Sequence, residues 1–188
     1  KIYFQQLPGP DDMDTSNTCW NPYGCVSPNF KFMVHSIALH PNSRDFIAGN
    51  KNGILQKWNT ENGELNAYKI LEDIPGQTDA TVYDIKYTRD GNAFIAVQQK
   101  CLYRINAVNL QVEDSLLLPD EDQILGIDMG YDGQVFGCIT KRQNDRIVQI
   151  RNIHDLKVRQ EFNTDGASFN KISFSPNKKQ AATASDDG

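Results

Sequence analysis

The sequence predicts an all-β protein built from a tandem repeat of short antiparallel strands. Apolar and polar residues alternate with a period of two in many short runs, which is the pattern of half-buried strands. Asn, Asp, Gly and Pro residues separate these runs, as expected for tight turns. The pattern of strands and turns recurs along the chain, and no stretch of helical periodicity lies between the strands. Each repeat is therefore expected to form a sheet.

Four segments of the chain begin with the same apolar spacing, and their first residues are Val34, Val82, Ile124 and Phe169. These positions are separated by 48, 42 and 45 residues. A turn-forming residue follows each start at the same offset, and β-branched or aromatic residues dominate the matched positions. The turn formers are Asn42, Asp90, Asp132 and Asn177. A repeat of this regularity is the signature of a modular architecture.

Each of the first three repeats divides into four strands, which in the first repeat read VHSIAL, RDFIAGN, GILQKWN and ELNAYKIL. Four antiparallel strands with a period near 45 residues are typical of a β-propeller blade. We expect three blades at residues 34–81, 82–123 and 124–168, and an incomplete fourth at 169–188. Because about three and a half blades cannot close a ring, we expect the sequence to belong to a longer chain or complex.

Two stretches carry a resemblance to a known family. FNKISFSPNKKQAATASDDG resembles the first half of a WD40 repeat, and VHSIALHPNSRDFIAGNKNGILQKWN resembles nearly a whole one. The resemblance covers residues 34–188, with Trp58-Asn59 at the family's Trp-Asp position. The chain has no Gly-His dipeptide, Asn52 takes the Asp place, and Ile105 and Ile150 are expected to replace Trp58 in the next two repeats. These diverged blades should therefore depend on apolar packing instead of the family's polar lock.

The resemblance implies a non-catalytic scaffold that binds other proteins within a multiprotein assembly. A structural component of a cytoskeletal or ciliary complex is one alternative. An enzyme or small-ligand domain that uses the central channel is another, and its candidate residues are Asp84, Lys86 and Asp128 on the inner strands. The sequence contains no hydrolase, phosphate-binding or metalloprotease motif. We therefore predict no catalytic residue, no metal and no cofactor.

Acidic residues concentrate in the connections between repeats, which carry no Lys or Arg. We predict that they form a partner-binding arc on one face, because such an arc would attract a basic segment. The alternative is that they only keep the surface soluble. A basic loop of Lys141, Arg142 and Arg146 should open on the same face and partly offset the arc. The acidic residues are Glu72, Asp73, Asp79, Asp120, Glu121, Asp122 and Asp165.

Residues 1–33 are expected to form a preceding strand, KIYF, and an insertion between blades. Trp20 and Tyr23 in this insertion are candidate anchors for a partner protein, since both residue types are favoured at interface hot spots. The alternative is an ordinary loop that packs these rings on a sheet edge. The acids near position 12 lack the Gly and Glu of a calcium-binding loop.

The net charge of −5 argues against a general attraction to nucleic acid, so none is expected as a partner. No apolar run is long enough to cross a membrane, and the first residues given, KIYFQQLPGP, contain no signal-peptide core. We therefore expect a cytoplasmic protein, with a cytoskeletal or ciliary setting as the alternative. Cys101 and Cys138 lie in apolar runs and should be buried as small hydrophobic residues. A Cys19–Cys25 disulfide stays open, although a reducing compartment disfavours it.

Overall fold

The structure is a computed structural model that describes residues 2–4, 23–25, 33–42, 44–72, 79–119, 121–143, 145–162, 168–177 and 180–186. Within these ranges every regular element is a strand, and no helix capable of crossing a membrane is found. The predicted all-β class is confirmed. Near the N-terminus, β1 (Ile2–Phe4) pairs with β2 (Tyr23–Cys25), a strand that the sequence pattern did not predict.

Three four-stranded antiparallel sheets follow, and we call them blades one, two and three. Blade one contains β3 (Val34–Leu39), β4 (Asp45–Asn50), β5 (Ile54–Asn59) and β6 (Leu65–Ile70). Blade two contains β7 (Val82–Tyr87), β8 (Ala93–Gln98), β9 (Cys101–Asn106) and β10 (Val112–Leu117). Blade three contains β11 (Asp122–Met129), β12 (Val135–Arg142), β13 (Asp145–Asn152) and β14 (Val158–Phe162).

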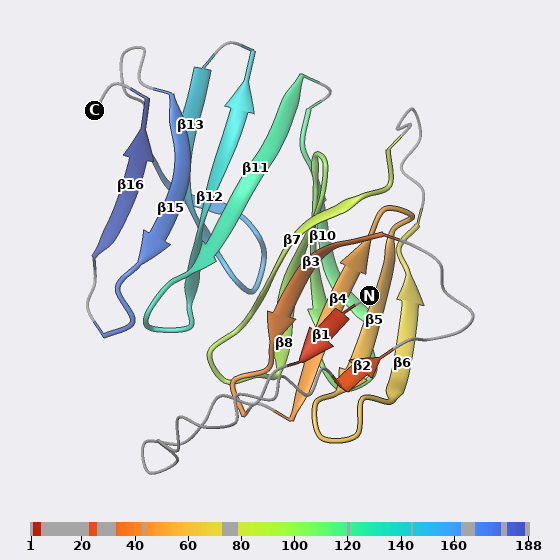
Figure 1. The fold of residues 1–188 in the computed structure, drawn as a ribbon. Coiled ribbons are helices and arrows are strands. Elements are labelled where there is room, and N and C mark those ends of the chain that lie inside the picture. The colour runs from red at the N-terminus through yellow and green to blue at the C-terminus, as the bar shows by residue number, and fades with distance from the viewer. Residues whose placement is uncertain are drawn as a thin grey trace, which may run out of the picture.

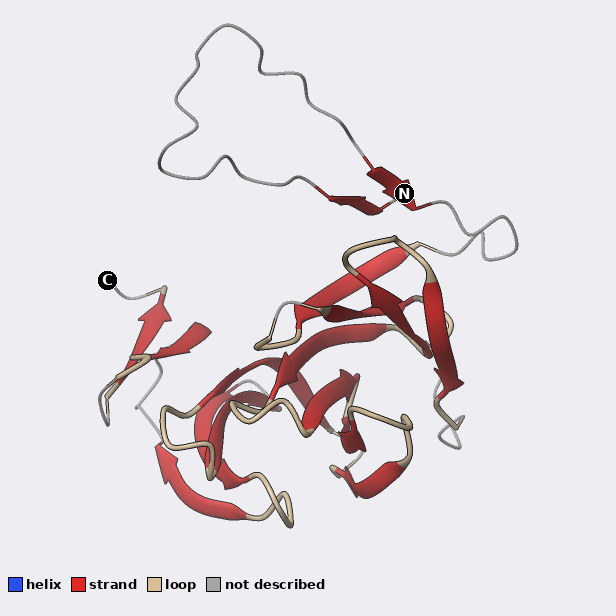
Figure 2. Ribbon diagram, turned by 90° about the horizontal axis from the view of Figure 1, so that it is seen from below, coloured by secondary structure: helices blue, strands red, loops and turns tan. Residues whose placement is uncertain are grey.

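Blade four has two paired strands among the described residues, β15 (Phe169–Phe174) and β16 (Ala181–Ser185). The blades stand side by side in an arc, as Figure 1 and Figure 2 show. The first strand of each blade lies beside the first strand of the next, so β3, β7, β11 and β15 are the inner strands. The described sheets leave the arc open. This arrangement confirms the predicted propeller of four-stranded blades.

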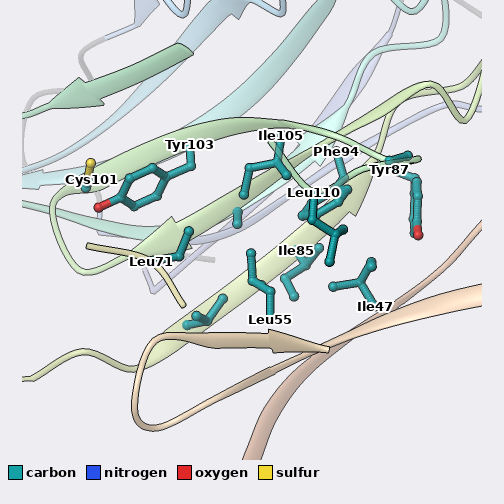
Figure 3. Close-up of a cluster of buried hydrophobic side chains, with 13 residues drawn as sticks. Ile47, Leu55, Leu71, Ile85, Tyr87, Phe94, Cys101, Tyr103, Ile105 and Leu110 are labelled. Atoms are coloured by element: carbon teal, nitrogen blue, oxygen red, sulfur yellow. The ribbon is translucent and has the colours of Figure 1, made fainter. Parts of the chain in front are cut away.

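Apolar side chains fill the space between neighbouring blades. Between blades one and two, Ile47 and Leu55 meet Ile85, Phe94 and Ile105 of the second sheet (Figure 3). A separate cluster joins blades two and three through other residues. Blade two therefore contributes both of its faces, and this explains why all six positions of β8 are buried without alternation. Blade two is therefore covered on both sides by its neighbours.

The largest buried side chains occupy matching positions in the repeats. Phe46, Phe94 and Phe136 are each 0% exposed, and each begins or nearly begins the second strand of its blade. In blade one Trp58 packs opposite Phe46, and its indole Nε1 has no hydrogen-bond partner among the described residues. The ring is thus held by packing, as expected for a blade without the family's polar lock.

We expect Phe94→Ala to lower the free energy of unfolding by about 3–5 kcal/mol, because it removes a fully buried ring and leaves a cavity between two blades. Chemical denaturation followed by intrinsic fluorescence measures the change. As a control, Val108→Ala alters a side chain that is 77% exposed and should change stability by less than about 0.5 kcal/mol. Equal effects of the two substitutions would contradict this core assignment.

Candidate protein-interaction surface

The strand order divides the loops between two faces of the arc. Because each blade has four antiparallel strands in sequence order, the connection from an outer strand to the next inner strand starts and ends on one face. The β4–β5, β8–β9 and β12–β13 turns open on that same face. We call it the connection face, and we call the other the opposite face (Figure 1). The predicted acidic residues that the structure describes lie in or next to connections on the connection face, and they are Glu72, Asp79, Glu121 and Asp122.

The structure describes four of the seven predicted acidic residues, and their environments differ. Glu72 and Glu121 are exposed, Asp79 is half-buried, and Asp122 is buried. Asp73, Asp120 and Asp165 lie outside the described residues. The four described acids are therefore not equivalent, and only the first two present a fully exposed carboxylate.

The Asp79 carboxylate is held at the start of β7 by three hydrogen bonds. One oxygen accepts the backbone N–H of Thr81 at 2.9 Å and its hydroxyl at 2.5 Å. The other oxygen accepts the hydroxyl of Tyr83. These bonds, with that from the Thr81 hydroxyl contributing most, lower the pKa of Asp79 below its ordinary value. Asp79 is thus an ionised group with a fixed orientation.

Asp122 takes part in a network inside the chain. Arg142 contacts the Asp122 carboxylate at 3.4 Å and the Glu161 carboxylate at the same distance. Next to it, the side-chain amide of Gln143 donates to Glu121 at 3.2 Å. Of the three basic residues predicted to offset the acidic arc, Arg142 contacts Asp122 directly. This contact occupies the Asp122 carboxylate.

Cations from the hairpin turns also reach the connection face. Lys51 lies in the β4–β5 turn and Lys100 in the β8–β9 turn. Arg146, near the start of β13, donates to the backbone carbonyl of Phe169 at 3.3 Å and to the side chain of Asn170. Among the described residues the face therefore carries both signs of charge. Recognition there must depend more on local groups than on a uniform acidic field.

Each inner strand carries a β-bulge at the second residue of its repeat, which in β11 is the fourth residue of the strand. Pairing with the neighbouring strand skips His35, Tyr83, Leu125 and Asn170. A bulge leaves one residue outside the ladder and redirects its side chain. His35, Tyr83 and Asn170 are exposed, whereas the residues just before Tyr83 and Asn170 are buried. The bulges therefore present a set of chemically different side chains at the start of the inner strands, on the connection face.

The inner-strand carboxylates proposed for a channel enzyme have a different use. Asp84 accepts the backbone N–H of Ile127 at 3.0 Å, and Asp128 accepts that of Phe174 at 2.7 Å. Each bond joins one blade to the next. Burial is the main effect on the Asp84 carboxyl and raises its pKa above the ordinary value. Lys86 is 3.8 Å from Asp84.

Blades one and two are joined by the hydroxyl of Ser36, which donates to the carbonyl of Val82 at 2.8 Å. This contact requires Gly49 on the neighbouring strand. A Cβ atom at Gly49 would lie 2.6 Å from the Ser36 oxygen and 2.7 Å from Val82. Blade-to-blade bonds from the inner strand thus recur at all three junctions, with different residue types.

A polar network in blade three replaces apolar contacts found in blade two. Arg151 is only 4% exposed. It lies opposite Phe136 in blade three, just as Ile105 lies opposite Phe94 in blade two, so Arg151 and Ile105 are equivalent positions. The expectation that Ile150 replaces Trp58 in this repeat is therefore wrong, because blade three holds Arg151 at that position. Counting residues missed this shift, since the strands of blade three are longer.

The Arg151 guanidinium donates to the Gln149 side-chain oxygen at 2.6 and 3.1 Å and to the Leu156 carbonyl at 2.8 Å. The Gln149 amide in turn donates to Glu161 at 2.7 Å. Gln149 therefore links a buried cation to a carboxylate. An open groove of about 700 Å³ borders this network, with an apolar wall from Leu116 to Pro119.

The histidines have packing and turn roles where they are described. His40 contacts the Tyr87 ring at 4.9 Å, and its Nε2 lies 3.0 Å from the Gly91 carbonyl. Since the backbone N–H of Asn42 donates to Nδ1, Nε2 is the atom that donates to Gly91. This histidine joins turns of blades one and two on the opposite face. His154 is exposed in the turn before β14.

Other predicted sites have less support in the described residues. Trp20 lies outside them, and of Tyr23 only the backbone is described, in β2. The Cys19–Cys25 disulfide also falls outside them. Cys101 and Cys138 are buried free thiols, as predicted. Over the ranges that the structure describes, no group of three His, Cys, Asp or Glu side chains is placed to hold a metal.

The repeated four-stranded blades around inner strands define the fold as a WD40-like β-propeller. Solved structures with this fold include the RRP9 WD40 repeats (TM-score 0.68, 13% identity) and U3-55K (TM-score 0.68, 13% identity). A third is the Cps50 (Swd1) β-propeller domain of Myceliophteria thermophila (TM-score 0.70, 12% identity). Each match covers 82% of this chain and 46–51% of the other, so the chain spans about half the length of these structures. At such identities the likeness shows the fold alone. No protein-family model and no curated protein matches the sequence.

We expect Asp84→Ala to be less stable than Asp84→Asn by about 1–3 kcal/mol, because only Asn keeps an acceptor for the Ile127 N–H. Denaturation midpoints of the two variants at neutral pH measure the difference. If Ala is as stable as Asn, the bond between blades does not contribute.

The raised pKa of Asp84 also predicts a pH dependence. Its contribution to stability is fully present below the ordinary value of 3.8 and is lost as pH rises through the higher value of the folded state. Asp84→Asn should therefore gain stability relative to the unsubstituted protein as pH rises from 3.8 to that higher value, and the difference should level off above it. A constant difference across the pH range would contradict the burial effect.

We expect Arg151→Leu to lower the free energy of unfolding by about 1–3 kcal/mol, because the Leu156 carbonyl loses its buried donor. Arg159→Leu on exposed β14 is the matched control and should stay within about 0.5 kcal/mol. Thermal and chemical denaturation of both variants tests this, and equal stability would show that the network is not stabilising.

Proposed function

We propose that this chain forms part of a non-catalytic scaffold that binds other proteins through its connection face, within a multiprotein assembly. The single observation that carries the proposal is the bulge at the second residue of every repeat. At three of these bulges the exposed side chains of His35, Tyr83 and Asn170 lie on one face, at the starts of the inner strands. Side chains that are held by a rigid scaffold but do not pack in its core are suited to contact a partner.

The roles of the inner-strand acids also favour a scaffold over an enzyme. A channel enzyme needs titratable groups that are free to reach a substrate. Asp84 and Asp128 instead accept backbone N–H groups of the next blade. Their carboxylates therefore support the fold.

The partner that we propose is a protein segment with basic residues. Glu72 and Glu121 are exposed on the connection face, and the ionised Asp79 lies between two blades. The mixed charge of the face predicts a moderate, salt-sensitive attraction in place of strong long-range steering. The residues Asp73, Asp120 and Asp165 stay candidates from the sequence.

Charge reversal on the two faces tests this function. We expect Glu72→Lys with Glu121→Lys to weaken binding of protein partners by about 2- to 10-fold, as for exposed ion pairs. Affinity capture from a cell extract, with quantitative mass spectrometry, compares the variant with the unsubstituted protein. The effect should shrink when salt rises from about 0.1 M to about 1 M, because the Debye length falls from about 10 Å to about 3 Å.

The control variant is Glu61→Lys with Glu64→Lys, in the β5–β6 turn of the opposite face. It makes the same change in net charge, and we expect it to leave the captured proteins unchanged. Loss of partners from the control but not from the connection-face variant would refute the assignment of the face.

A further inference from the structure

A cluster of exposed groups lies where blades one and two meet on the connection face. Met33 is 65% exposed and Tyr83 is 41% exposed, although both residue types favour burial. The rings of His35 and Tyr83 are 6.4 Å apart and meet edge to face at 68°. Asp79 lies beside the Tyr83 hydroxyl. We call His35, Asp79 and Tyr83 the Tyr83 cluster.

The hydrogen bonds of the cluster fix its geometry before any partner arrives. The Tyr83 hydroxyl donates a hydrogen bond to one Asp79 oxygen. The backbone N–H and the hydroxyl of Thr81 donate hydrogen bonds to the other oxygen. Hydrogen bonding to Asp79 is the main effect that raises the pKa of Tyr83, so the phenol stays protonated. An aromatic face with an ionised carboxylate at its edge favours a cation.

The repeat itself shows how a cation can be placed next to a bulge. Arg146 directly precedes Ile147 in β13. Its guanidinium donates to the carbonyl of Phe169, the residue before the bulge of blade four, and to the side chain of the bulged residue Asn170. By strand register, Lys100 takes this place in blade two and Gly53 in blade one. Gly53 has no side chain and a φ of 73°, which most other residues adopt only with strain. At the junction of blades three and four, Arg146 supplies a cation next to the bulge. At the junction of blades one and two, Gly53 occupies the matching position and supplies none.

The nearby charges of the chain leave the carboxylate accessible to a partner. Lys51 attracts Asp79 electrostatically, but no ion pair between them is present among the described residues. Glu72 follows β6 on the same face and adds a second negative charge.

We propose that the Tyr83 cluster binds an arginine or lysine side chain of a partner segment, with its cationic group over the Tyr83 ring and near Asp79. This inference rests on the proposed function and specifies one contact within it. The partner's cation would occupy a position like that of the Arg146 guanidinium at the junction of blades three and four.

The test uses a short Gly-Ser peptide with one central arginine and the same peptide with citrulline, the neutral analogue. Titration is followed by NMR signals of the His35 and Tyr83 rings. We expect the arginine peptide to shift these signals and the citrulline peptide to bind about 3- to 10-fold more weakly. Equal binding of the two peptides, or binding of neither, would overturn the proposal.

Variants assign the binding to the cluster. Tyr83→Leu should lower the affinity for the arginine peptide by about 3- to 10-fold. Tyr68→Leu, which changes an exposed residue of β6 in blade one, should leave this affinity unchanged. Lys51→Gln should strengthen binding, because it removes a competing cation near Asp79. A gain of binding in this variant cannot arise from a damaged fold. An unchanged affinity in both Tyr83→Leu and Lys51→Gln would overturn the proposal.

Failure here is distinguishable from failure of the scaffold function. If Tyr83→Leu retains all captured proteins while the connection-face charge variant loses them, the Tyr83 cluster is not the contact but the face still binds. If only the opposite-face control loses partners, the proposed face itself is refuted.

Discussion

Apolar contact between neighbouring blades is the interaction on which the whole structure depends. A four-stranded sheet in which β8 is buried at every position has two hydrophobic faces and needs a cover for each. The next sheet supplies that cover, so Phe94 of blade two packs toward blade one while Ile95 packs toward blade three. Because the faces are fixed in this way, the inner strands come into line and their starts share one side of the arc.

Polar contacts between blades set the details that apolar packing leaves undetermined. Ser36, Asp84 and Asp128 each bond to the backbone of the following inner strand. A directional bond of this kind fixes how far one sheet slides along the next, whereas apolar contact tolerates small shifts. The network around Arg151 has a similar effect within blade three, at the cost of burying a charge. Packing and polar bonds together fix how the inner strands lie against one another.

The sequence predicted the sheets well because strand period, turns and the regular spacing of Phe46, Phe94 and Phe136 are local signals. It predicted the candidate surface less completely. The bulges add a residue that alternation cannot reveal, and the turn cations Lys51 and Lys100 were not counted with the acidic connections. Asp122 looked like a surface acid, but its contact with Arg142 comes from a distant strand. Arg151 was missed for a related reason, since blade three has longer strands and residue counting gave Ile150. The cytoplasmic, cytoskeletal or ciliary setting of the protein stays a prediction from the sequence.

The bulged positions separate the evolution of recognition from the evolution of the fold. A residue that is skipped by strand pairing and exposed to solvent can change its chemistry without creating a cavity or breaking the ladder. The three exposed bulged positions already differ, with imidazole, phenol and carboxamide side chains at the same structural place. A propeller of this kind can acquire a new partner by substitutions at a few such sites, while selection on the blades preserves their shape. Sequences of this fold can therefore differ at most positions, as the 12–13% identities show, and still share one architecture. The same architecture can then carry many different binding specificities.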